Sequence, residues 1–148
     1  MSYLKFERIG HMQLYSREDA ILGSWPAHND TASYSNGRWP SGRYAWSHYN
    51  RHPQMGLAPA CISTPFGCEG IHVFDVSVHG RTGMGIHAGR AWKVDVLGPR
   101  LGGRSLGCVR TTEDAMAAIN RTHAVDPLAH VVIDEGWFAY PIGRCLTA

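Results

Sequence analysis

Short apolar runs recur along this chain, and glycine, proline and polar residues separate them. The runs at residues 3–6, 12–15 and 20–25 predict three short strands in an opening meander, because turn signals lie between them. Residues 92–96 alternate strictly between apolar and polar side chains, which is typical of a half-buried strand. The first half of the pattern therefore favours a β-rich fold.

The centre and the end of the chain carry the same pattern. Residues 71–78 and 84–87 predict two further strands, joined by a turn at 80–83, and residues 130–134 predict the last strand. Residues 28–43 are polar and rich in Gly, Pro, Asn and Ser, so we expect a loop there.

A single helix is predicted between the last two strands. We expect Thr111 to be its N-cap, with Glu113 and Asp114 in the first turn and an apolar run at 115–119. Short strands with one helix predict an α+β, β-rich single domain over residues 1–148. Its core would be a β-sandwich or an open barrel, with at least one covering helix.

Composition supports this class and excludes others. The chain has 148 residues, of which 44% are hydrophobic and 18% charged, which excludes a mostly disordered protein. Its 17 glycines and 8 prolines indicate many turns. A net charge of +2 without a basic run predicts no nucleic-acid partner, and no apolar run is long enough to predict a membrane span.

The chemistry centres on Cys108. Residues 105–110 read Ser-Leu-Gly-Cys-Val-Arg, and His87 ends a predicted strand upstream, so that the two side chains lie on neighbouring elements. A thiol attacks acyl carbons as thiolate, and an ordinary cysteine has a pKa of about 8.5. We expect His87 to take the proton, and we expect the cysteine to sit at a strand-to-helix junction where the helix start favours negative charge. The main-chain amides of Gly107 and Cys108 can then hold an oxyanion.

These residues resemble the signature of the L,D-transpeptidase catalytic domain, also called the YkuD domain. The resemblance rests on His87, on Ser-x-Gly-Cys ending at Cys108 with Val-Arg after it, and on residues 40–44, which read Pro-Ser-Gly-Arg-Tyr like the family's Pro-x-Gly-x-Tyr segment. It covers residues 22–132 and is closest to the compact members associated with interbacterial effectors and phage.

The resemblance implies a cysteine enzyme that acts on the stem peptides of peptidoglycan. Cys108 would attack the carbonyl of the third residue of a tetrapeptide stem, His87 would protonate the leaving D-alanine, and a thioester acyl-enzyme would remain. Water would then give L,D-carboxypeptidase activity, a second stem would give a 3-3 cross-link, and a free D-amino acid would give exchange. No cofactor is implied.

Three further residues complete the candidate site. Ser105 is a catalytic candidate, with a hydrogen bond to its own loop as the equal alternative, and Gly107 is the oxyanion candidate. Arg110 either binds a substrate carboxylate through its planar guanidinium or pairs on the surface with Glu113 or Asp114.

Two departures from the family pattern keep another class of function open. Leu106 stands where the family usually has histidine, and Ala88 stands where many members have glycine. The orienting partner of His87 is therefore either a backbone carbonyl or an unidentified side chain. The alternative function is a catalytically silent peptidoglycan-binding or adaptor module with the same fold. A cysteine peptidase acting on protein is less favoured.

The remaining cysteines bear on the compartment. Cys61 and Cys68 are seven positions apart and either form a disulfide or stay reduced, and Cys145 is either a thiol or paired elsewhere. The first residues lack a basic region followed by an apolar core, so we expect no signal peptide. Export by a secretion system or release by phage-type lysis would deliver the protein to the periplasm. An antibacterial role would also imply a cognate immunity protein.

The histidines and aromatic residues have ordinary explanations. His48 and His52 have a four-residue spacing, but Pro53 follows and no glutamate follows His48, so we expect no metal site. Aromatic side chains between residues 39 and 49 are expected in the core or on a half-buried strand, with a glycopeptide groove as the alternative: Trp39, Tyr44, Trp46 and Tyr49.

Overall fold

The computed structural model describes residues 1–8, 10–29, 39–51, 60–77, 80, 83–89 and 108–134. Within these residues the chain forms eight strands, one α-helix and a short 3-10 helix. In chain order they are β1 (Ser2–Glu7), β2 (His11–Tyr15), β3 (Ile21–His28), β4 (Gly42–Asn50), η1 (Ala60–Ser63), β5 (Ile71–Phe74), β6 (Gly85–His87), β7 (Val109–Thr111), α1 (Glu113–Val125) and β8 (Leu128–Asp134).

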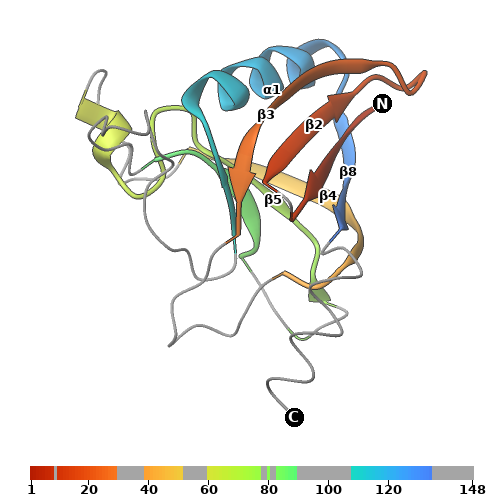
Figure 1. Cartoon of the computed structure of the whole chain (residues 1–148), viewed down its shortest axis with the longest axis horizontal. Coiled ribbons are helices and arrows are strands. Elements are labelled where there is room, and N and C mark those ends of the chain that lie inside the picture. Colours follow the sequence, from red (N-terminus) through yellow and green to blue (C-terminus); the bar gives the residue numbers. More distant parts are fainter. Residues whose placement is uncertain are drawn as a thin grey trace.

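The eight strands close into a barrel. Their order around it is β1-β2-β3-β7-β6-β5-β4-β8, and β8 returns to pair in parallel with β1 (Figure 1). This confirms a β-rich fold with a covering helix and replaces the expected sandwich or open barrel with a closed one. The closure needs β8 to pair with β1 on one side and with β4 on the other, and both pairings join segments far apart in the chain.

The opening meander is confirmed. β1 pairs antiparallel with β2, and β2 pairs antiparallel with β3. Alternate residues of β1 and β2 are buried, as the period of two along a strand requires. They join the barrel's core with residues from the other strands and the helix, including Leu4, Phe6, Met12, Leu14, Trp39, Phe74, Ile86, Val109, Met116 and Ile119.

The loop expected at residues 28–43 is confirmed where the structure describes its interior, at Asn29 and at residues 39–41, whereas its two ends belong to strands. β3 continues to His28, and β4 already begins at Gly42. Most residues of β4 are exposed, so the strand lacks an apolar stripe that its sequence could show. Backbone pairing with β5 and β8 defines it instead.

The other predicted strands are confirmed with changed ends. β5 stops at Phe74 rather than at residue 78, β6 occupies Gly85–His87, and β8 begins at Leu128. The strand predicted at 92–96 lies outside the described residues.

Helix α1 begins one residue later than its predicted cap implies. Thr112 is the N-cap, and its Oγ1 accepts a hydrogen bond of 3.1 Å from the backbone N–H of Ala115. Thr111 instead belongs to β7 and donates its hydroxyl to the carbonyl of Pro26 at 2.8 Å. The expectation that Thr111 caps the helix was therefore wrong, whereas the acidic first turn of Glu113 and Asp114 is confirmed.

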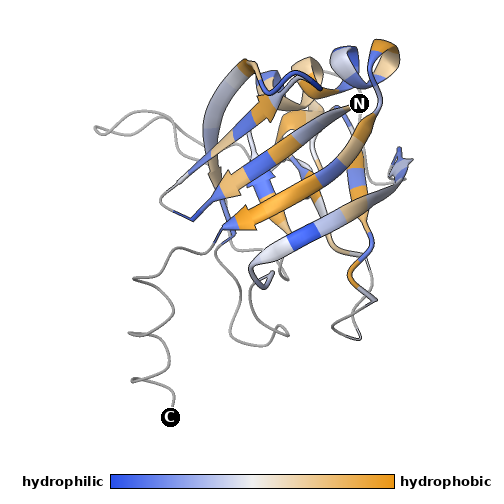
Figure 2. Cartoon of the chain, turned by 90° about the vertical axis from the view of Figure 1, so that its right-hand side faces the viewer, coloured by the Kyte–Doolittle hydropathy of each residue, from blue (hydrophilic) through white to orange (hydrophobic). Residues whose placement is uncertain are grey.

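The helix covers one end of the barrel. It crosses the top of the strands in Figures 1 and 2, with Ala115, Met116 and Ile119 buried against the core. In Figure 2, apolar and polar colours alternate along several strands, as expected when one face of each strand looks into the barrel.

A chain of hydrogen bonds ties the helix to the strands. The indole Nε1–H of Trp46 donates to Nδ1 of His72 at 3.1 Å, so the ring proton of His72 lies on Nε2, which donates to Oδ1 of Asn120 at 2.7 Å. The amide nitrogen of Asn120 then donates to the carbonyl of Glu69 at 3.0 Å. Burial lowers the pKa of His72 to about 4, so its imidazole is neutral at pH 7.

Replacing Thr112 by alanine is expected to destabilise the protein by about 1 kcal/mol, because the N–H of Ala115 loses its acceptor. Urea denaturation followed by circular dichroism measures this change. Thr122→Ala, in the body of the same helix, is the control and should change stability by less than about 0.5 kcal/mol. Equal losses in the two variants would contradict the assignment of the cap.

His72 should make the fold sensitive to acid. Its pKa is lower in the folded protein, about 4, than the ordinary value of 6.5, so the unfolded chain binds more protons between these values. The stabilising contribution is complete above pH 6.5 and is lost as the pH falls towards 4, by roughly 3 kcal/mol in all. Urea titrations at pH 7 and pH 4.5 measure it. His72→Gln should be less stable at pH 7 but lose less stability on acidification, and an unchanged acid loss would rule out this role.

Candidate active site

The pairing of β6 with β7 places the candidate residues. The two strands run parallel, with Ile86 opposite Val109 and His87 opposite Arg110. Ile86 and Val109 point into the barrel core. Because side chains alternate along a strand, His87 and Arg110 project from the outer face, and so does Cys108, two positions before Arg110.

Cys108 and His87 are therefore diagonal neighbours on one face of the sheet. Strand spacing and rise place their Cα atoms roughly 8 Å apart, a separation that an imidazole and a thiol can bridge. β6 and β7 are paired, so His87 and the residue that precedes β7 lie on neighbouring elements, as the sequence predicted.

The proton arrangement of His87 follows from its backbone contact. Its ring is only 3% exposed, and Nδ1 lies 2.6 Å from the carbonyl oxygen of Ala88. A carbonyl only accepts, so Nδ1 of His87 donates this hydrogen bond. One partner that orients the ring is therefore a backbone carbonyl next to the histidine itself.

Cys108 lies at a different place from the one expected. It directly precedes β7, so three strand residues separate it from Thr112 and the helix start. Four steps along an extended chain cover roughly 13 Å, which lies beyond the first turn in which a helix dipole acts. The expected strand-to-helix junction was wrong, and α1 does not stabilise a thiolate at Cys108. The Sγ atom lies 3.7 Å from the carbonyl oxygen of Gly83 and is partly exposed.

Arg110 is buried beside His87. Its side chain is 3% exposed, and Nη2 donates to the carbonyl of Pro65 at 3.2 Å. Burial overturns the alternative of an exposed surface ion pair. The carboxylate of Glu113 instead accepts the backbone N–H of Cys68.

Two of the predicted residues cannot be placed. Ser105 and Gly107 lie outside the described residues, as do Leu106 and residues 90–104. The role of Ser105 and the oxyanion amide at Gly107 stay predictions.

A groove of about 420 Å³ lies beside the thiol. Its walls come from β4, from the end of β5 with the residues after it, and from Gly83, whose carbonyl contacts Cys108. Trp46, His48, Val73, Asp75 and Ser77 are among the lining residues.

Asp75 is the charged side chain of this groove. Its Oδ1 accepts the backbone N–H of Ser77 at 2.9 Å, and that hydrogen bond lowers the pKa of the carboxyl. Asp75 and Gly83 could not be predicted from the sequence, since only the pairing of the end of β5 with the chain before β6 brings them to the site. The backbone N–H of Phe74 bonds the carbonyl of Met84 there, at 3.0 Å.

The aromatic residues divide between core and groove. Trp39 and Tyr44 are buried in the core, so the groove alternative is wrong for these two, whereas Trp46 lines the groove. Tyr49 is partly exposed and donates its hydroxyl to the carbonyl of Glu69 at 2.6 Å.

The open question of Cys61 and Cys68 is settled in favour of a disulfide. Cys145 lies outside the described residues. Within the described part of the chain, no three His, Cys, Asp or Glu side chains gather closely enough to hold a metal ion. In the same part, no helix combines the length and the apolar character needed to cross a membrane.

Comparison with known proteins identifies the fold. Neither the family models nor the curated sequences gave a match. Solved structures did. The structure of Bdellovibrio bacteriovorus Bd1075 matches 99% of this chain and 55% of its own length, with a TM-score of 0.58 and 15% identity. A crystal structure of a mutant Enterococcus faecium L,D-transpeptidase matches 89% of this chain and 49% of its own length, at a TM-score of 0.55 and 15% identity.

A third match has nearly the same size as this chain. The catalytic domain of the E. faecium L,D-transpeptidase, acylated by ertapenem, is covered over 95% of its length, with 89% of this chain aligned, 16% identity and a TM-score of 0.50. The chain spans about half the length of the larger structures it matches. These likenesses establish that the chain has the fold of an L,D-transpeptidase catalytic domain.

Proposed function

We propose that this protein is a cysteine acyltransferase of the L,D-transpeptidase type that acts on the tetrapeptide stems of peptidoglycan. The observation that carries the proposal is the placement of Cys108 and His87 on one outer face of two paired parallel strands, in a fold shared with L,D-transpeptidase catalytic domains. Arg110 lies on the same face and extends the site.

The first half of the reaction uses these residues directly. Nε2 of His87 takes the thiol proton of Cys108, and the thiolate forms a bond to the carbonyl carbon of the third stem residue. The amides of Gly107 and Cys108 hold the oxyanion, and Ser105 assists. When the tetrahedral intermediate collapses, the amide C–N bond breaks. The amine of D-alanine takes the proton back from the imidazolium, and a thioester remains.

The acceptor decides the product. A side-chain amine of a second stem gives a 3-3 cross-link, water gives a tripeptide, and a free D-amino acid gives exchange. In each case the neutral His87 again takes a proton, this time from the attacking group, and the thiol is regenerated.

The groove beside Gly83 is the proposed site of the stem peptide. Gly83 lines this groove, and its carbonyl contacts Sγ of Cys108, so a peptide in the groove lies near the thiol. The ionised Asp75 favours a cation in the groove, and the third stem residue of peptidoglycan is a diamino acid with a side-chain amine.

We also propose that the protein acts in the periplasm of a target bacterium as an antibacterial effector, with a cognate immunity protein in the producer. The Cys61–Cys68 disulfide supports an oxidising destination. A growth assay tests the role: targeting the protein to the periplasm should be toxic, and Cys108→Ala should not be.

A catalytically silent peptidoglycan-binding module is the second candidate. The burial of His87, at 3% exposure, is the observation that favours it, because a base must reach the reacting groups. Thiol reactivity separates the two functions, since a binding module has no need of an activated Cys108.

Cys108→Ala is expected to abolish turnover of tetrapeptide muropeptides, and His87→Ala should lower it by about 10²- to 10⁴-fold. Mass spectrometry of the products measures both effects and names the acceptor, because loss of D-alanine and formation of a dimer give different masses. A mass increase at Cys108 with ertapenem is a second readout of acylation.

His11→Ala is the matched control. His11 pairs with Glu7 at 3.3 Å on a strand outside the candidate site, and its replacement should leave turnover unchanged. Unchanged muropeptides with folded wild-type protein, or full turnover by Cys108→Ala, would refute the proposed enzyme.

Asp75→Asn is expected to raise KM for stems with a free side-chain amine by about two- to fivefold, the range of an exposed ion pair. Asparagine keeps the shape and still accepts the N–H of Ser77, so the change removes mainly charge. Steady-state kinetics compares stems that carry the free side-chain amine with stems in which that amine is acetylated. An equal rise in KM for both stems would argue against the charge of Asp75.

A further inference from the structure

We propose that the disulfide-closed loop, residues 61–68, positions His87 and Arg110, so that reduction of the Cys61–Cys68 disulfide disables the site while the barrel stays folded. This inference rests on the proposed function and adds a positioning element to it. Four sets of contacts carry it: those within the loop, those with helix α1, and those with each of the two site residues.

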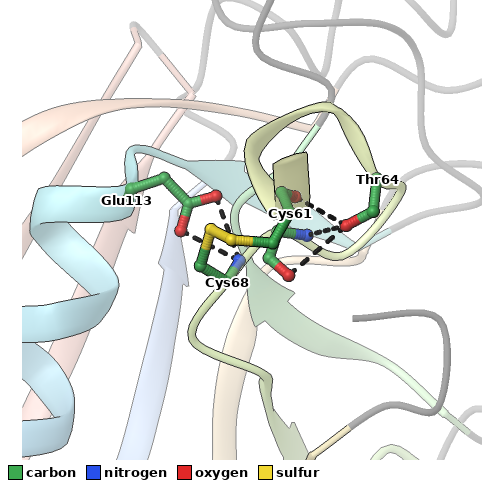
Figure 3. Close-up of a disulfide and its surroundings, with 5 residues drawn as sticks. Cys61, Thr64, Cys68 and Glu113 are labelled. Carbon is green, nitrogen blue, oxygen red and sulfur yellow. Dashed lines mark hydrogen bonds between the residues drawn. A yellow bond between two sulfur atoms is a disulfide. The ribbon is translucent and has the colours of Figure 1, made fainter. Parts of the chain in front are cut away.

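The loop has a fixed internal frame. Besides the disulfide, the hydroxyl of Thr64 donates to the carbonyl of Cys61 at 2.7 Å and accepts the N–H of Gly67 at 3.1 Å (Figure 3). Gly67 has a φ of +74°, and a Cβ there would collide with Oε1 of Glu113 and approach the backbone of Gly89. The chain therefore turns tightly between the two cysteines.

One end of the loop is fastened to the helix. The N–H of Cys68 donates to both carboxylate oxygens of Glu113, at 3.2 and 3.1 Å, and Glu113 is the first residue of α1 (Figure 3). Since the disulfide joins Cys68 to Cys61, this contact anchors both ends of the loop.

The middle of the loop lies on the candidate site. The ring of Phe66 packs against the imidazole of His87 with centroids 4.9 Å apart, and the carbonyl of Pro65 accepts from Nη2 of Arg110 at 3.2 Å. Two consecutive loop residues thus contact the two side chains that face each other across β6 and β7.

The same stretch also presses on the backbone that orients the histidine. A Cβ at Gly89 would collide with the carbonyl oxygen of Thr64 and approach Pro65, so the loop and the chain after β6 are in close contact. Ala88, whose carbonyl holds Nδ1 of His87, precedes Gly89 directly. Loss of the loop's shape would therefore loosen both the ring of His87 and its hydrogen-bond acceptor.

The loop is separable from the barrel's core. None of residues 61–68 belongs to the core cluster, which is built from the strands, α1 and four residues outside them: Trp39, Val76, Met84 and Ala88. A dithiol such as dithiothreitol supplies two electrons and two protons to the disulfide, giving two thiols and its own cyclic disulfide. The expected product is a folded barrel with an unclosed loop, in which His87 and Arg110 lose their cover.

The test compares wild-type protein with the Cys61→Ser/Cys68→Ser double variant. Turnover of muropeptides should fall at least tenfold in kcat, with a smaller change in KM, because the loop positions the base and does not line the groove. Alkylation of Cys108 by iodoacetamide, followed on its own peptide by mass spectrometry, should slow. The pH midpoint of this alkylation should rise towards about 8.5, the pKa of an ordinary thiol. Wild-type protein treated with dithiothreitol should lose turnover to a similar extent and regain it on reoxidation.

A second pair of variants keeps the disulfide. Phe66→Ala should lower kcat and raise the pH midpoint of Cys108 alkylation, and Phe66→Tyr should restore both, because a ring again packs on His87. Ile62→Ala is the matched control, since Ile62 lies in the same loop, is 40% exposed and should have no effect. If circular dichroism shows that the double variant is unfolded, the Phe66 variants alone test whether the loop positions His87.

The outcomes distinguish this inference from the function on which it rests. Wild-type protein with an activated Cys108, together with double and Phe66 variants that match its turnover and alkylation profile, would overturn the positioning role and leave the enzyme intact. Wild-type protein with no turnover and an ordinary thiol at Cys108 would overturn the proposed function itself.

Discussion

The parallel pairing of β6 with β7 is the constraint on which the candidate site depends. Ile86 and Val109 face each other inside the barrel, and both are completely buried. Slipping one strand by a single residue would turn its buried apolar side chain outward and bring a polar one into the core. Core packing therefore fixes the register, and the register fixes His87 against Arg110 with Cys108 beside them. Hydrophobic contacts on the inner face of the sheet thus hold the candidate residues on its outer face in position.

The two buried histidines, His72 and His87, differ in their hydrogen-bond partners and in their positions on the sheet. His72 has both ring nitrogens engaged, by Trp46 and Asn120, and burial keeps it neutral between the barrel and α1. His87 is just as buried, but its Nδ1 contacts the carbonyl of Ala88, and its side chain lies on the face of the sheet that carries Cys108. Burial alone does not distinguish them. The identity of the hydrogen-bond partner and the face of the sheet do.

Local signals predicted much of this structure. The meander of β1 to β3 and the helix followed from periodicity and from acidic residues in a first turn, and Cys108 with His87 followed from residue type and spacing. What failed depends on contacts distant in sequence. β4 is a mostly exposed strand, and it is defined by its pairing with β5 and β8. Closure of the barrel requires β8 to pair with β1, which lies at the other end of the described chain. The N-cap is Thr112 and not Thr111, because Thr111 pairs with β3 as the last residue of β7. Asp75 and Gly83 could not be predicted as site residues, because only the pairing of two chain segments brings them to the site.

The loop at residues 61–68 shields the candidate site from water, which strands β6 and β7 alone do not do. An exposed outer face of a barrel would leave a thiol and an imidazole in water, where the attraction between a thiolate and an imidazolium is weak. Phe66 and the carbonyl of Pro65 exclude water from His87 and Arg110, and charges that form there interact more strongly. The same exclusion requires that every polar group in the site keep its partner. A loop closed by a covalent bond meets this requirement better than a mobile one, because its contacts are held together before any substrate arrives.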